Sequence, residues 1–159
     1  MTSFLTKTPV LWLLFAGFVL QSVGFGVIMA IWDFTVIDEM SDPEKVRGHI
    51  AAMSETQRLV HVWTTATLDV AYPLTYGALF AGLALTRFPS IWAAPAIAVI
   101  PVDLAEGFVQ VIALLGNDQL IELKAILTPL KLVLFGIAAF IALAAFLLAV
   151  RSRLTSKTS

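Results

Sequence analysis

The sequence predicts an all-α, polytopic integral membrane protein, in which four transmembrane helices form a bundle and an amphipathic helix lies on the outer side between the first two. The first observation behind this prediction is composition: 59% of the 159 residues are hydrophobic and 13% are charged, against about 45–50% and 25% in a soluble domain. The second is a mean hydropathy of +0.91, and the third is a set of four long apolar stretches. Together they exclude a soluble domain and a disordered chain. We expect a single domain over residues 1–159.

The four apolar stretches have the length of membrane spans and lie at about residues 10–31, 62–86, 91–115 and 125–150. Each exceeds the roughly 20 residues that cross a hydrocarbon core. The first also exceeds the roughly 7–15 apolar residues of a signal peptide, so we expect it to be retained as a helix. Tryptophan supports these boundaries because indole rings favour the membrane interface. Trp12 and Trp92 would share one side, and Trp32 and Trp63 the other.

The distribution of Lys and Arg predicts that both termini are cytoplasmic, in a cytoplasmic (inner) membrane. The tails and the loop between the second and third spans carry Lys7, Arg87, Arg151, Arg153 and Lys157. The outer side carries Lys45, Arg47, Arg58 and Lys124, together with most of the acidic residues. The predicted orientation therefore rests on five basic residues on the cytoplasmic side against four on the outer side.

An amphipathic helix is predicted at about residues 43–60, between the first two spans. Asp42 suits the N-cap position and Pro43 the first helical position. Apolar residues then recur at helical spacing from Val46 to Val60. Such a helix could lie along the outer surface or continue into the second span, and it could act as a connector or as a lid.

Ionisable residues inside the predicted spans are the strongest functional signal. Asp69, Asp103, Glu106 and Lys131 would each cost about 2.5–3.5 kcal/mol if they faced lipid at the bilayer centre. They must therefore face one another, water or a ligand. Counted from the outer helix ends, they lie at similar depths, and we expect Lys131 to contact at least one of Asp69 and Glu106.

Helical spacing places polar companions beside these residues. On the second span Tyr72 and Tyr76 follow the stripe of Asp69, on the third Gln110 follows Glu106, and on the fourth Thr128 lies between Lys124 and Lys131. The first span offers Gln21. The candidate catalytic residues are thus Asp69, Asp103, Glu106 and Lys131, and the candidate substrate-binding residues are Tyr72, Tyr76, Gln110, Thr128 and Gln21. A purely structural role, in which these groups specify helix packing, is an equal alternative.

Other chemistry has weaker support in the sequence. His49 and His61 are twelve positions apart, which is not the spacing of a helical metal pair. We expect surface histidines, although His61 could lie near the mouth of the stripe that leads to Asp69. The absence of Cys excludes disulfides, thiolate metal sites and iron–sulfur clusters. We expect no cofactor and no metal ion.

Three classes of function remain open. Three carboxyls around one amine cannot all be ionised in a poorly solvated space, so at least one is expected to hold a proton. This could serve acid/base chemistry on, or binding of, a lipid-like hydrophobic substrate, or it could serve a proton- or cation-coupled transporter or pore. The third class is a non-catalytic membrane assembly or scaffold component. The expected partners are membrane lipids and a hydrophobic small molecule, and the net charge of −1 argues against nucleic acid.

Overall fold

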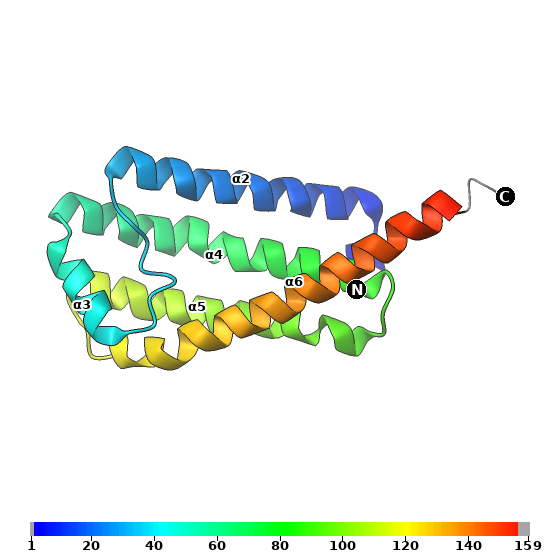
Figure 1. The fold of residues 1–159 in the computed structure, drawn as a ribbon. Helices are drawn as coiled ribbons and strands as arrows, with labels where there is room; N and C mark the ends of the chain where they lie inside the picture. The colour runs from blue at the N-terminus through cyan, green and yellow to red at the C-terminus, as the bar shows by residue number, and fades with distance from the viewer. Residues whose placement is uncertain (1, 156–159) are drawn as a thin grey trace.

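The computed structural model describes residues 2–155, and these residues form helices joined by short connections, with no strand among them. The four long helices are α2 (Thr8–Trp32), α4 (Glu55–Leu85), α5 (Ala94–Leu114) and α6 (Lys124–Thr155). Single 3-10 turns, η1 (Ser90–Ala93) and η2 (Ile121–Leu123), precede α5 and α6. Two shorter helices, α1 (Thr2–Leu5) and α3 (Pro43–Ala52), lie at opposite ends of the bundle (Figure 1).

Four helices are long and apolar enough to span a membrane, which indicates a multi-pass membrane protein. With their 3-10 turns they contain 25, 31, 25 and 35 residues, and at about 1.5 Å per residue each exceeds a hydrocarbon core of roughly 30 Å. The predicted all-helical bundle is confirmed at this level. The second and fourth helices extend well beyond the predicted spans, because polar turns are added at the end where α3 lies and, for α6, at the opposite end as well.

Helix α4 is central to the packing. It lies against α2, α5 and α6, whereas α6 crosses the bundle diagonally and packs on α4 and α5 (Figure 1). Gly77 permits the close approach of α4 to α5, since a Cβ atom there would lie 2.6 Å from the Ile100 side chain and 2.9 Å from the carbonyl oxygen of Ala96. Because α2 packs mainly on α4, one side of the bundle is less tightly closed than the other.

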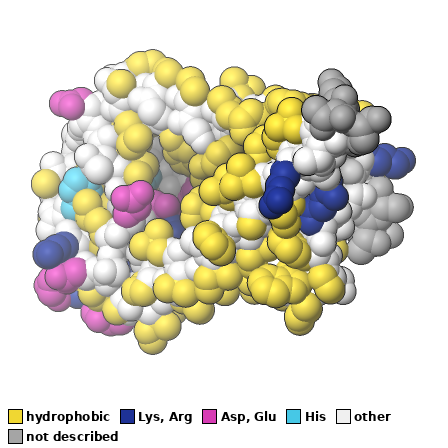
Figure 2. All heavy atoms as spheres, turned by 45° about the vertical axis from the view of Figure 1, so that its right-hand side comes forward, with side chains coloured by type: hydrophobic (Ala, Val, Ile, Leu, Met, Phe, Trp, Pro, Cys, Tyr) yellow, Lys and Arg dark blue, Asp and Glu magenta, His cyan; other side chains and the backbone are white. Residues whose placement is uncertain are grey.

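The outer surface of the bundle is apolar, and charge gathers at its ends. Figure 2 shows hydrophobic side chains over the middle of one face, with Lys and Arg toward one end and a mixture of Asp, Glu, Lys, Arg and His toward the other. The four tryptophans are all exposed, as expected of residues at a lipid interface: Trp12, Trp32, Trp63 and Trp92.

The amphipathic helix is shorter than predicted, because it ends at Ala52 and α4 begins at Glu55. Its predicted N-cap is present, with Asp42 Oδ1 accepting the backbone N–H of Glu44 at 3.0 Å. The chain then breaks because Ser54 begins a new helix. Ser54 and Gln57 form a capping box, in which each side chain bonds the other residue's backbone N–H. The expected single helix over 43–60 is therefore two helices.

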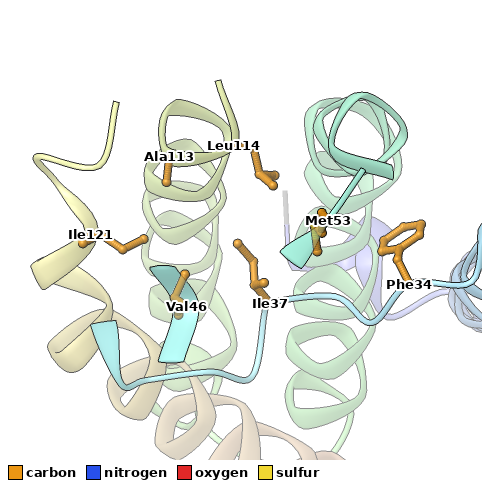
Figure 3. Packing of buried hydrophobic residues seen from close by; sticks show 7 residues of the cluster. All are labelled: Phe34, Ile37, Val46, Met53, Ala113, Leu114 and Ile121. Carbon is orange, nitrogen blue, oxygen red and sulfur yellow. The ribbon is translucent and has the colours of Figure 1, made fainter. Parts of the chain in front are cut away.

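A small apolar cluster fixes α3 and the loop at residues 33–42 onto the bundle. We call it the capping cluster, and it consists of Phe34, Ile37, Val46, Met53, Ala113, Leu114 and Ile121 (Figure 3). Ile37 and Val46 are fully buried in it. The loop is thus docked against the end of α5 and the start of α6. Because Ile37 is fixed in this cluster, the next residue, Asp38, is held close to the bundle.

Candidate functional site

The Lys131 ammonium group lies among three carboxylates near the α3 end of the bundle. Its Nζ atom is 2.5 Å from Glu106 Oε2, 2.6 Å from Asp38 Oδ1 and 3.4 Å from Asp103 Oδ1. The predicted contact with Glu106 is therefore present. Among residues 2–155, Asp69 forms no ion pair with Lys131.

Glu106 is the most enclosed of these acids and has the most partners. Its Oε1 atom accepts hydrogen bonds from Lys124 Nζ and from Thr128 Oγ1, while Oε2 lies against Lys131. The side chains of Glu106 and Lys124 are completely buried. The sequence placed Lys124 on the outer side. It is instead inside the bundle. Lys124 is the first residue of α6, and it follows closely after Ile121, which is buried in the capping cluster.

Asp38 completes the group, although no pattern in the sequence predicts it there. It lies in the loop at residues 33–42, yet its Oδ1 atom accepts hydrogen bonds from Lys131 Nζ at 2.6 Å and Gln110 Nε2 at 3.1 Å. Burial by itself would raise the pKa of Asp38, but the charge of Lys131 and the bonds from Lys131 and Gln110 outweigh it, so the pKa lies below the ordinary 3.8. Asp38 is therefore a carboxylate at neutral pH. The apolar residues beside it were the only available signal that this loop folds inward.

Asp103 is the third carboxylate beside the Lys131 ammonium group. Its Oδ2 atom accepts a hydrogen bond from the Tyr76 hydroxyl at 2.6 Å. Tyr76 is 1% exposed and packs edge-on against Phe135. We call Asp38, Asp103, Glu106, Lys124 and Lys131 the ion network. Each of these five side chains has an oppositely charged partner within it.

A pocket of about 190 Å³ lies beside the ion network and is about half enclosed. It is bounded by α2, the loop at residues 33–42, α4 and α5, through side chains that include Ser22, Phe25, Asp38, His61, Asp69, Tyr72 and Gln110. Figure 2 shows a hollow with acidic side chains on the face that it displays. Asp38 thus belongs to both features, because it is held by Lys131 and also lines the pocket.

Several polar atoms at the pocket have no partner among the described residues. The Asp69 carboxyl group has neither a hydrogen bond nor an ion pair there, and its Oδ2 atom would lie 3.5 Å from a Cβ atom placed on Gly107. Gln110 Oε1 and His61 Nδ1 are also buried without a hydrogen-bond partner in residues 2–155. A pocket lined by residues whose polar atoms have no hydrogen-bond partner is suited to a polar ligand group.

The two histidines, both expected at the surface, lie in different environments. His61 is 1% exposed, and its ring lies 5.1 Å from the ring of Phe34. The expectation of a surface histidine is thus wrong for His61, because the loop at residues 33–42 covers it. Its alternative position, near the stripe that leads to Asp69, is the one observed. His49 lies on α3, with Nε2 3.0 Å from the carbonyl oxygen of Thr35.

The candidate residues from the sequence divide between the two features. Asp69, Tyr72 and Gln110 line the pocket, and Tyr72 also shares a hydrogen bond with Ser22 at 3.1 Å. Those in or bonded to the ion network are Asp103, Glu106, Lys131, Tyr76, Thr128 and, through its bond to Asp38, also Gln110. Gln21 lies on α2, and its Oε1 atom is buried with no hydrogen-bond partner among the described residues.

Oxygen atoms of Asp38, Asp103 and Glu106 lie within 4.8 Å of one another, close enough for three of them to share a metal ion. The Lys131 ammonium group contacts all three of these carboxylates. It supplies the positive charge that a metal ion would otherwise bring. The arrangement therefore resembles an internal ion cluster more closely than a metal site.

Comparisons with protein-family models, with curated proteins and with solved structures found no match to this chain.

Proposed function

We propose that this protein binds a lipid-like hydrophobic molecule in the pocket beside Asp69 and carries out acid/base chemistry on it. The observation that carries the proposal is the combination of a half-enclosed pocket and a carboxyl that has no partner in residues 2–155. An intramembrane ionisable group in such a place is a functional candidate by default. A membrane-embedded pocket also receives its ligands from the bilayer, which favours lipid-like molecules.

The two acids of the pocket suit different roles. Asp38 is held as a carboxylate by Lys131 and Gln110. Asp69 has no such partner among the described residues, so it is free to give a proton to a bound molecule or take one from it. The ion network then holds one wall of the site in place, because Lys131 joins Asp38 to α6. Gln110 bonds Asp38 directly and so joins it to α5.

A structural role is the second candidate, and it is favoured for the inner part of the ion network. Glu106, Lys124 and Thr128 are 0% exposed, and Lys124 and Thr128 both donate hydrogen bonds to Glu106. They do not line the pocket. We assign these three residues to helix packing rather than to chemistry, so a scaffold function and a catalytic one predict different effects at Glu106 and at Asp69.

Transport receives less support from the packing. On the side of the ion network away from α3, the rings of Tyr76, Phe80 and Phe135 lie 5.0 to 5.8 Å apart. Beyond them the helices meet through alanines, among them Ala81 and Ala138. Such packing is unfavourable for a continuous water path, which a proton or cation carrier needs.

We also propose the orientation that the distribution of Lys and Arg predicts, with both termini in the cytoplasm and α3 outside. It is tested on the full chain, which has no Cys, by introducing single cysteines at Ser3 or Ser41. A membrane-impermeant maleimide should label the Ser41→Cys variant in intact cells and the Ser3→Cys variant only after lysis. The reverse pattern would contradict this orientation.

The chemistry is tested in deuterated water. Purified protein is incubated with the lipid extract of its own host membrane, and products are analysed by mass spectrometry. Acid/base turnover at carbon places solvent deuterium in the product, so we expect a mass increase in selected lipids. The Asp69→Asn variant should lose this incorporation at unchanged abundance, whereas Glu39→Gln, which removes an exposed charge near Asp38, should retain it. Equal incorporation in both variants would overturn the proposal, as would its absence in the unmodified protein.

A further inference from the structure

The unused atoms of the pocket specify the class of group that it accepts. Gln110 Oε1 is an amide oxygen and accepts hydrogen bonds only. Asp38 presents carboxylate oxygens, and the Asp69 carboxyl group keeps an accepting oxygen in either protonation state. His61 Nδ1 accepts in one of its two neutral tautomers. Gln110 and His61 are also almost completely buried, at 0% and 1% exposure. The pocket therefore holds an excess of acceptors, and a matching ligand group must bring several N–H or O–H donors.

Charge adds a second, independent requirement. Near the pocket the carboxyl groups are those of Asp38, Asp69, Asp103 and Glu106, and the ammonium groups are those of Lys124 and Lys131. Both lysines are already paired within the ion network. The Asp69 carboxyl is the group left without a cation among the described residues. A positively charged ligand would pair with it, whereas an anionic ligand would add to the surplus of negative charge.

We infer that the pocket binds amphiphiles with a protonated amine as the headgroup, their apolar tail extending toward the bilayer. A primary ammonium group provides three donors and one positive charge. Asp69 would accept a charge-assisted hydrogen bond from it, and Gln110 Oε1 would accept another. The inference deepens the proposed function and depends on it for the location of the ligand, but not for any chemical step.

The size of the pocket sets how much of such a ligand it encloses. Its volume is about 190 Å³, whereas an apolar cavity of about 150 Å³ holds one benzene molecule. An ammonium group and the first few carbons of a chain therefore fit, but a complete lipid does not. Phe25 and Tyr72, whose ring centroids lie 5.5 Å apart, provide an apolar and aromatic wall for those carbons. The remaining chain must leave through the open side of the pocket.

The test compares probes that share a tail and differ in the headgroup. The full chain in phosphatidylcholine nanodiscs is photolabelled by a dodecylamine that carries a diazirine in its tail, and the labelled peptides are mapped by mass spectrometry. Labelling should fall on peptides containing Phe25 or Tyr72. Unlabelled dodecylamine should compete best, dodecyltrimethylammonium less well because it has no N–H donor, dodecanol weakly, and dodecanoate least. Competition by dodecanol or dodecanoate equal to that of dodecylamine would overturn the inference.

Variants locate the binding group. Asp69→Asn should weaken competition by dodecylamine about tenfold or more, the loss expected for one charge-assisted hydrogen bond. Asp69→Glu should restore part of it, and Glu39→Gln should leave it unchanged. If Asp69→Asn does not yield folded protein, the order of the four headgroups on the unmodified chain still decides the question. Amine binding without deuterium incorporation would remove only the proposed chemistry, and turnover with no preference for amines would remove only this inference.

Discussion

Lys131 Nζ lies 2.6 Å from Asp38 Oδ1, although the two residues are 93 positions apart in the chain. This ion pair joins the loop at residues 33–42 to α6, and the adjacent Ile37 anchors the same loop in the capping cluster. One side of the loop is therefore held by apolar packing and the other by charge. Because Asp38 also lines the pocket, any opening of the loop changes one wall of the candidate site.

Removing the Asp38 charge should loosen the loop without unfolding the bundle. In Asp38→Asn, hydrogen exchange of residues 33–42 should accelerate about tenfold, the effect of losing roughly 1.5 kcal/mol from one charge-assisted hydrogen bond. Exchange within α5 should not change. Glu39→Gln is the matched control, since it removes the neighbouring exposed charge. Equal acceleration in both variants would mean that the Lys131 pair does not hold the loop.

The same ion pair predicts a pH dependence with a definite sign. The pKa of Asp38 in the folded protein lies below its ordinary value of 3.8. Its contribution to loop stability is therefore fully present above pH 3.8 and is lost as the pH falls through the lower, folded value. Loop exchange, corrected for its intrinsic pH dependence, should accelerate on acidification in the unmodified chain. In Asp38→Asn this acceleration should be smaller.

Removal of Glu106 should destabilise the whole bundle, because it leaves Lys124 without its ion-pair partner in a fully buried position. We expect Glu106→Gln to lower the free energy of unfolding by about 3–5 kcal/mol, as measured by tryptophan fluorescence during denaturation in sodium dodecyl sulfate. The double variant Glu106→Gln with Lys124→Met should recover part of this loss, because both buried charges are then gone. Glu122→Gln, at an exposed glutamate, is the control and should have little effect. A similarly small effect at Glu106 would contradict a packing role for the ion network.

The sequence predicts the helices and those residues of the candidate site that lie on them, but not the part that depends on the loop at residues 33–42. Long apolar runs and helical spacing are local properties, so the spans, the Asp42 cap and the common face of Asp103, Glu106 and Gln110 could be read directly. Contact of Lys131 with at least one of Asp69 and Glu106 followed from helical phase and depth together, and Glu106 is the residue in contact. The positions of Asp38 and His61 depend on a loop folding back over the bundle, which no local period encodes. The break at Ser54 was missed because the apolar stripe continues across it.

The close contact of α4 with α5 at Gly77 can be tested by adding one methyl group. A Cβ atom at Gly77 would lie 2.9 Å from the backbone oxygen of Ala96, which cannot move without moving α5. We expect Gly77→Ala to cost about 1–3 kcal/mol of unfolding free energy. Gly136→Ala is the matched control on α6, since nothing lies within 4 Å of its Cβ position, and alanine favours a helix by up to about 1 kcal/mol over glycine. A stabilising effect at both positions would show that the helices are not in close contact at Gly77.

The connection between α3 and the start of α6 should depend on the geometry of Arg47 rather than on its charge alone. Its guanidinium group bonds Glu44, Asp118 and Glu122 at 2.6 to 2.9 Å, and hydrogen bonds from Arg47 to Glu122 and Asp118 raise the pKa of Arg47 above its ordinary value. Arg47 is therefore charged at every pH at which the protein is folded. A lysine keeps the charge but cannot hold three carboxylates in one plane.

We expect Arg47→Lys to accelerate hydrogen exchange of α3 at low ionic strength while leaving thermal unfolding of the bundle almost unchanged, because the capping cluster still holds the segment. About 0.5 M salt should accelerate exchange of α3 in the unmodified chain, since screening weakens exposed ion pairs. The same salt should change the variant less. Arg58→Lys is the control, because Arg58 has no ion pair among the described residues. Exchange of α3 that is insensitive both to salt and to Arg47→Lys would show that apolar packing alone positions α3.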